Sequence, residues 1–401
     1  MIPDINNELL KLSAEFFKET ISNRHYLHQH PELSFQEFNT ALYVEQKLKN
    51  IGLTEVHRLS NTGVVALLKA DKNVQGKVVA LRADLDALPI IETNDIPYKS
   101  LNKGVMHACG HDVHTAVLLT VAKILFKLKD KIEGNIKFIF QPGEELLPGG
   151  ASLMIDEGVL KNPEVDCLIA QHVTPDIPAG KIGFRPGLFM ASTDEIYIKV
   201  KGKGGHAAMP HTYTNPLLLS SAIITELHKI FMIEKQGNTH EIPTVLAFGK
   251  IIGEGATNVI PDEVNMAGTF RTLNEEWRKR CHQTIKETVK NLSQLYGGIC
   301  DIEIKYGYPC LVNDETLTEA CINTARNILG NDNILSLDYR MTAEDFAFYS
   351  HHKPVCFYRL GTGNKLKNTC NGVHTSVFNI DEDVLEYAPA IMAAMAINAL
   401  S

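Results

Sequence analysis

The hydrophobic pattern of the chain begins as helical and then changes to alternating strands and helices. Before Gly63, apolar residues recur at near-helical spacing around Leu9–Phe17 and again over Gln36–Ile51. From Gly63 to about Pro186, short β-rich runs alternate with helical stretches, which predicts an α/β fold with a mostly parallel sheet. The predicted strands are Gly63–Leu68, Lys77–Ala83, Asn135–Phe140 and Val165–Ala170, with helices at about His114–Lys129 and Ala151–Glu157.

The pattern differs between residues 187 and 310, where the predicted order β-α-β-β-α-β is typical of a small α+β sandwich. These elements are strands Asp194–Val200, Thr244–Ile252, Val264–Arg271 and Cys300–Tyr306, and helices Pro216–Phe231 and Glu275–Leu295. The α/β pattern resumes afterwards with helix Leu317–Leu329, strand Pro354–Leu360 and a closing helix Val384–Leu400. We therefore predict a discontinuous domain, 1–186 and 311–401, into which residues 187–310 are inserted as a second domain.

The composition narrows the class of protein. Of the 401 residues, 44% are hydrophobic and 21% are charged, as in globular domains. The formal net charge of −8 argues against a nucleic-acid partner, because such a surface needs a basic patch. No run approaches the ~18 apolar residues of a membrane span, and the N-terminus lacks the apolar core of a signal peptide. The eight cysteines are scattered without a CxxC pair, so we expect reduced thiols and a cytoplasmic location.

Metal-capable and acid–base residues collect where the predicted strands of the larger domain end. In open α/β sheets, ligands bind beyond the carboxyl ends of the strands. We therefore expect side chains from distant parts of the chain to meet at one rim of the sheet. These side chains are Asp84, Asp86, Glu144, Glu145, His172 and His374, together with His107, Cys109, His111 and Asp112 from one loop.

Cys109 and His111 are the pair most indicative of a metal. Gly110 lies between them and allows a turn that points both side chains into one site. A thiolate and an imidazole suit zinc, and also manganese, cobalt or nickel. The alternative is a buried structural cysteine beside surface histidines, but the density of histidines around Cys109 favours a metal site.

Two pairs of carboxylates suggest a division of roles. In the pair Glu144–Glu145, one carboxylate would bind the metal and the other would take a proton from the water that the metal activates. The alternative for this pair is a solvated turn. Asp84 and Asp86 lie on the same face of an extended segment, where a carboxylate can fix the tautomer of a ligand histidine. A turn capped by aspartate is the alternative, and it stays open for Asp84.

The inserted domain adds a glycine-rich segment, Lys201–His211. It lacks the Gly-Lys-Ser/Thr sequence of a phosphate-binding loop, so we reject that interpretation. A glycine turn that presents His206 to a substrate is the functional interpretation. A surface-loop histidine is the alternative.

Six segments of the chain, in order, resemble the amidohydrolase branch of the aminoacylase/carboxypeptidase superfamily. That branch includes hippurate hydrolases, auxin-conjugate hydrolases and N-acetyl-diaminopimelate deacetylases. The match covers nearly the whole chain and extends to Arg24–His28 and Pro31–Leu33. The six segments are Leu81–Pro89, Met106–Asp112, Gln141–Glu145, Gly204–His211, Asn258–Asp262 and Thr342–Phe346.

The resemblance implies a zinc-exopeptidase-like α/β fold with helices on both faces of the sheet, and a site for two divalent metal ions. It implies that Cys109 bridges the ions, that Glu144 is the general base and that Asp86 supports a ligand. The inserted domain would mediate dimerisation, and its His206 would stabilise the oxyanion, in the partner's active site. Asn258 and Arg271 would hold the substrate. The remaining metal ligands would be His111, Glu145, His172 and His374.

Small departures from the family pattern, at Val113, Asn215 and Ser376, affect neither a ligand nor the base. They leave the substrate pocket in question. The leading hypothesis is hydrolysis of an N-acyl or N-aroyl amino acid. A dipeptidase with the same metals is the nearest alternative, and an inactive metal-binding scaffold or a redox sensor acting through Cys109 are alternatives of other classes.

Overall fold

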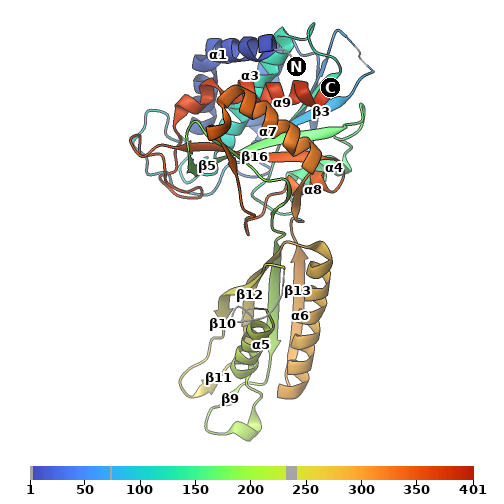
Figure 1. Ribbon diagram of the computed structural model, residues 1–401. Helices are drawn as coiled ribbons and strands as arrows, with labels where there is room; N and C mark the ends of the chain where they lie inside the picture. Colours follow the sequence, from blue (N-terminus) through green and yellow to red (C-terminus); the bar gives the residue numbers. More distant parts are fainter. Residues whose placement is uncertain (1–2, 73–74, 232–241) are drawn as a thin grey trace. The chain divides into compact units, whose positions relative to one another are not determined.

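The computed structural model describes residues 3–72, 75–231 and 242–401, which form two compact units (Figure 1). Unit 1 comprises Met1–Phe189, Val312–Asp338 and Asp345–Ser401. Unit 2 comprises Met190–Leu311 and Tyr339–Glu344. Unit 1 is therefore assembled from three segments that are far apart in the sequence.

Unit 1 contains an eight-stranded mixed sheet with the strand order β1-β2-β4-β3-β5-β16-β6-β15. The four central strands β4, β3, β5 and β16 are parallel to one another, whereas β1 and β2 are antiparallel additions at one edge. β3 and β4 are buried along their whole length, because a parallel sheet is covered on both faces. The strands are β1 (Glu55–Leu59), β2 (Gly63–Lys69), β3 (Val78–Asp84), β4 (Asn135–Gln141), β5 (Cys167–Pro178), β6 (Ile182–Phe184), β15 (Ile334–Ser336) and β16 (Val355–Gly363).

Helices cover both faces of this sheet, which confirms the predicted fold class. Phe138 and Phe140 of β4 belong to the apolar core that α3 and α9 share, while Lys137 contacts the segment that follows α4. Since neighbouring residues of a strand point to opposite faces, these two groups of helices lie on opposite sides of the sheet. The helices of unit 1 are α1 (Pro3–Gln29), α2 (Phe38–Ile51), α3 (His111–Lys127), α4 (Gly150–Asp156), α7 (Glu315–Leu329), α8 (Ala347–Ser350) and α9 (Ala388–Leu400).

Several element boundaries differ from the prediction. The closing helix begins at Ala388 and not at Val384, because Pro389 has no N–H to donate and suits the first helical turn. β16 continues through Gly361 and Gly363, beyond its predicted end at Leu360. A Cβ atom at these glycines would lie only 2.3 and 2.0 Å from carbonyl oxygens of β5, so the glycines allow the two strands to stay close together. β5 itself continues to Pro178, and His172 therefore lies within a strand and not beyond its end.

Unit 2 is a two-layer sandwich with a four-stranded antiparallel sheet in the order β10-β12-β8-β13. Its apolar core lies between this sheet and two helices, with Ile196, Ile198 and Val200 alternating along β8. The elements are β8 (Asp194–Lys201), β10 (Thr244–Ile252), β12 (Glu263–Thr272), β13 (Ile299–Tyr306), α5 (Pro216–Phe231) and α6 (Glu275–Tyr296). In unit 2, β9 (Gly205–His206) also pairs with β11 (Val259–Ile260). A further short ladder pairs β7 (Gly187–Met190) with β14 (Leu311–Asn313), and most of its residues belong to unit 1.

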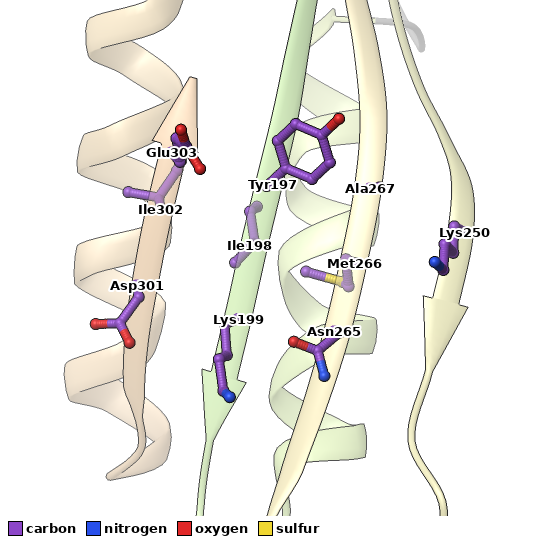
Figure 2. A pocket seen from close by; sticks show the side chains of 10 residues that line it. All are labelled: Tyr197, Ile198, Lys199, Lys250, Asn265, Met266, Ala267, Asp301, Ile302 and Glu303. Atoms are coloured by element: carbon purple, nitrogen blue, oxygen red, sulfur yellow. The ribbon is translucent and has the colours of Figure 1, made fainter. Parts of the chain in front are cut away.

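The other face of the unit 2 sheet carries charged and polar side chains around a hollow of about 300 Å³ (Figure 2). Cross-strand ion pairs join Lys199 to Glu263 at 2.8 Å and Lys201 to Asp301 at 2.7 Å. Such paired charges are typical of a solvated sheet face. Among the helices of the described ranges, none combines the length and the apolar character that a membrane crossing requires.

Lys137 carries a testable contribution to the stability of unit 1. Its buried ammonium donates to the carbonyls of Val159, Lys161 and Pro163 at 2.8–2.9 Å, and burial lowers its pKa to about 8. Lys137→Met would leave these carbonyls without their donor. We expect a loss of about 2–4 kcal/mol in the free energy of unfolding, measured with urea. The matched control is Lys353→Met, which removes a surface ion pair to Glu164 and should change the free energy of unfolding much less.

Candidate metal centre and active site

Six of the predicted site residues lie together at one rim of the unit 1 sheet, near the ends of β3, β4 and β16 and part-way along β5. Their potential ligand atoms form three overlapping groups, and within each group all atoms lie within 4.8 Å of one another. The groups are Cys109–His111–His172, Cys109–Glu145–His374 and His111–Glu144–Glu145. Because Cys109 and His111 each belong to two groups, the donors form one continuous cluster.

Asp86 fixes the orientation of His111. The Nδ1 atom of His111 lies 2.9 Å from the backbone oxygen of Asp86 and 3.1 Å from its carboxylate, so Nδ1 carries the proton and donates it there. The buried Nε2 atom has no hydrogen-bond partner among the described residues. Burial lowers the pKa of His111, but Asp84 and Asp86 outweigh burial and raise it to about 10, so Nε2 is protonated without a cation, and a cation that binds there would displace this proton. His111 is thus oriented to give Nε2 to a cation.

His172 is oriented in the same way by a backbone group. Its Nδ1 atom donates to the carbonyl of Val173 at 2.7 Å, which leaves Nε2 facing the sulfur of Cys109 at 3.4 Å. Burial, followed by the charge of Arg359, lowers the pKa of His172, so the ring is neutral. A neutral imidazole with a free Nε2 is the form that binds a metal.

His374 reaches the cluster from the loop after β16. Its backbone N–H donates to the carbonyl of Ala108 at 2.7 Å, and its φ of +62° is unusual for a residue other than glycine. Its Nε2 atom lies 3.0 Å from Oε1 of Glu145. The bond to Ala108 therefore ties this late loop to the segment that carries Cys109.

The charges of the cluster suit divalent cations. Burial, together with Glu145 and Glu144, raises the pKa of Cys109 well above its ordinary value. Without a cation, a thiolate here would add a negative charge to a buried group of carboxylates. A cation reverses this preference, because it stabilises the thiolate and the carboxylates together. The mixture of sulfur, nitrogen and oxygen donors fits zinc or a similar first-row ion.

A fourth group of donors, Asp84, His111 and His114, is not an open site. Val173 N–H donates to Nε2 of His114 at 3.0 Å, so Nδ1 of His114 carries the proton and donates to Asp84 at 2.6 Å. The second oxygen of Asp84 accepts from Arg82 at 2.6 Å. The role of Asp84, which the sequence left open, is therefore to hold His114 against the strand that carries His172.

His107 and Asp112, the other polar residues of the loop, point elsewhere. Asp112 accepts from His28 at 2.9 Å and from the buried Arg24 at 3.2 Å, and these bonds tie the start of α3 to α1. His107 is buried, and burial lowers its pKa to about 4, so it is neutral. The histidine density that suggested a metal thus includes two residues, His107 and His114, outside the metal-facing cluster.

The candidate residues of unit 2 lie at two different ends of that unit. His206 pairs with Val259 across the β9–β11 ladder, and Ala207 donates to the backbone oxygen of Asn258 at 3.0 Å. Both His206 and Asn258 are exposed. Arg271 lies at the opposite end of β12, where it donates to the carbonyl of Met341 at 3.1 Å. Since β12 rises ~3.3 Å per residue, roughly 25 Å separates the two ends.

An α/β sheet with sulfur, imidazole and carboxylate side chains clustered at its rim is the architecture of a metal-dependent hydrolase. Residues 80–398 match the model of the peptidase family M20/M25/M40. The chain belongs to this family, and its homologues are named as hydrolases, among them amidohydrolases and deacetylases.

Individual relatives agree over most of the chain. An N-acyl-L-amino acid amidohydrolase of Geobacillus stearothermophilus is 41% identical over 306 residues, which is 76% of this chain and 81% of that protein. The structure of a putative aminohydrolase from methicillin-resistant Staphylococcus aureus has a TM-score of 0.90 at 34% identity, covering 99% of this chain and 100% of that one. The Bacillus subtilis YXEP protein, a dinuclear metal binding peptidase of family M20, has a TM-score of 0.82 at 32% identity, covering 96% and 98%.

Proposed function

We propose that the protein hydrolyses the amide bond of N-acyl or N-aroyl amino acids, with two divalent metal ions held by Cys109, His111, Glu145, His172 and His374. The observation that carries this proposal is the position of Glu144. Its carboxylate is buried within the donor cluster, 4.0 Å from Nε2 of His111. The amidohydrolase relative and the dinuclear peptidase of family M20 support the substrate class and the number of ions.

In this mechanism Glu144 first accepts a proton and then donates the same proton. It first takes the proton from the attacking water, whose oxygen bonds to the amide carbon. It then gives the proton to the leaving nitrogen as the C–N bond breaks, which releases a carboxylic acid and a free amino acid. Divalent ions bound by the cluster supply Lewis acidity, which lowers the pKa of water and polarises the carbonyl. Asp86 would keep His111 in the tautomer that binds a metal, and Cys109 would be one of the residues that hold the ions.

His206 has the hydrogen-bonding pattern that an oxyanion donor needs. Its Nδ1 atom accepts the N–H of Ala208 at 3.1 Å, so Nε2 is the ring nitrogen that carries a proton. That N–H can donate to a developing oxyanion. Asn258 lies beside it, and Arg271 lies roughly 25 Å away along β12. Because an N-acyl amino acid is much shorter than that, both ends of unit 2 can serve one substrate only if they come from two copies of the chain.

Unit 2 also has a surface suited to a second copy of the chain, and we propose a homodimer formed there. β10 is an edge strand of the sheet, and its last residues Ile251 and Ile252 are exposed. Leu217 and Leu218 of the neighbouring α5 are exposed as well. An unpaired edge with apolar side chains is prone to pair with another edge. This arrangement would make residues 187–310 the dimerisation domain.

Leu218→Glu tests the dimer. Leu218 is 56% exposed, so a glutamate there should leave the fold intact and place charge in the proposed interface. We expect the variant to be a monomer at micromolar concentration by light scattering, with activity reduced at least tenfold because His206 no longer reaches a partner. The matched control is Leu295→Glu on α6, which exposes 76% of its side chain and should remain a dimer. A dimeric, fully active Leu218→Glu variant would contradict this interface.

The reaction is tested by elemental analysis of the purified protein combined with a substrate panel. We expect two zinc or manganese ions per chain, with nickel or cobalt as functional replacements. Acetyl- and benzoyl-amino acids should be hydrolysed, and chelation should abolish activity until metal is returned. The family name favours peptide cleavage as the second candidate function. Faster turnover of dipeptides with a free amino group than of acylated amino acids would replace the proposed function with that one.

A further inference from the structure

The two backbone N–H groups that flank Glu144 are each held by a buried carboxylate. Glu145, after the base, donates to Oδ2 of Asp86 at 2.9 Å. Gly143, before the base, donates to Oε1 of Glu37 at 2.8 Å. Asp86 belongs to the metal centre through His111, but Glu37 comes from the segment that precedes α2, which the proposed mechanism does not use. The turn that carries the base is therefore fixed from both sides.

The neighbours of Glu37 contact the same turn. The Phe35 ring lies against Gly143, where an added Cβ would approach the ring to 2.3 Å, and Gly143 has a φ of +58°. The hydroxyl of Ser34 donates to Oδ2 of Asp86 at 2.7 Å, the same oxygen that accepts from Glu145. Three of the four side chains in residues 34–37 therefore contact either this turn or the carboxylate of Asp86.

The position of Glu37 is electrostatically unfavourable. It is completely buried, and burial followed by the charge of Asp86 raises its pKa to about 7. Its oxygens are fully engaged, because Oε1 also accepts the N–H of Phe35 at 2.9 Å and Oε2 accepts the hydroxyl of Thr62 at 2.7 Å. A buried carboxylate beside another carboxylate does not favour folding by itself. Its geometry is explained by what it holds, namely the N–H of Gly143.

We propose that Glu37 is a positioning residue for the hydrolytic reaction: its carboxylate holds the Gly143 amide and thereby sets the position of Glu144 relative to the metal ligands. Its acceptor oxygen, and not its negative charge, is what the turn requires. This inference rests on the proposed function, in which Glu144 is the base. A displacement of about 1 Å at a catalytic group can reduce the rate by about a hundredfold.

Three variants test the role. Glu37→Ala removes the acceptor, and we expect kcat to fall about 10- to 100-fold while KM changes less than about threefold. Glu37→Gln keeps an amide oxygen for Gly143 and Phe35, and it should restore kcat to within about threefold of wild type. Thr62→Val removes only the bond on the far oxygen and should keep full activity with some loss of thermal stability. Each variant is first checked by circular dichroism and by its metal content.

Two kinetic results would overturn the inference: a folded Glu37→Ala protein with wild-type kcat, or a Glu37→Gln protein as slow as Glu37→Ala. Amide hydrogen exchange of the Gly143 N–H gives a readout that does not depend on activity. The exchange should accelerate in Glu37→Ala and stay slow in Glu37→Gln, and unchanged exchange in Glu37→Ala would also overturn it. If the wild-type protein hydrolysed no substrate of the panel, the proposed function would fail, while the exchange data would still decide whether Glu37 holds the turn.

Discussion

Replacing Glu144 with Ala is expected to reduce kcat by about a thousandfold or more and to leave the metal content unchanged. Glu144 is buried beside the ligand cluster, and in the proposed mechanism it is the only group that moves the proton from water to the leaving nitrogen. Steady-state kinetics on the best acyl-amino acid, with elemental analysis of the same sample, measure both parts. Substrate affinity should change little, because the loss lies in the chemical step.

Two companion variants make the result specific. Glu145→Ala should lose metal as well as activity, because Glu145 belongs to the Cys109–Glu145–His374 group of donors. Glu157→Gln, an exposed carboxylate whose oxygen accepts the N–H of Ser60, should behave as wild type. If Glu144→Ala retained full activity with full metal, Glu144 would not be the base and the mechanism would have to be drawn differently.

The sequence could predict most of the residues that meet at the rim because it predicted where the strands lie along the chain. His172 and His374 carry no signal of their own, and only their places near the predicted strands pointed to a site. The reason is geometric: the carboxyl ends of neighbouring parallel strands lie side by side whatever their distance in sequence. The lengths of those strands were harder to predict. β16 extends through Gly361 and Gly363 because these glycines pack closely against β5, and this contact depends on both strands.

The sequence predicted one bond that supports the site, from Asp86 to a ligand histidine, but not the others. Asp84 could equally have capped a turn, and its role became clear only when Val173 was found to donate to His114. Glu37 lies more than a hundred residues before the glycine that it holds, and nothing in its local pattern distinguishes it from other glutamates before a helix. Hydrogen-bond partners at such separation depend on how elements pack, which hydrophobic periodicity does not encode.

Coexpression of Glu144→Ala chains with His206→Ala chains is expected to recover about a quarter of the wild-type activity, although each variant alone is nearly inactive. The proposal places His206 of one chain in the active site of the other. A mixed dimer then has one site with both defects and one site with neither. Random pairing makes half of the dimers mixed, so about a quarter of all sites are intact. Two different affinity tags allow the mixed dimer to be isolated, where half of the sites should work.

The recovered activity shows whether His206 serves the active site of its own chain or that of the partner, because the two arrangements predict different outcomes. If His206 served the site of its own chain, every site in the mixed dimer would lack one of the two groups, and no activity would return. Adding Leu218→Glu to both chains should remove the recovery, because chains that do not pair cannot exchange His206. The control pair with Leu295→Glu should keep it. If chains carrying Leu218→Glu remained dimeric and the recovery persisted, the shared site would not depend on the α5 and β10 surface.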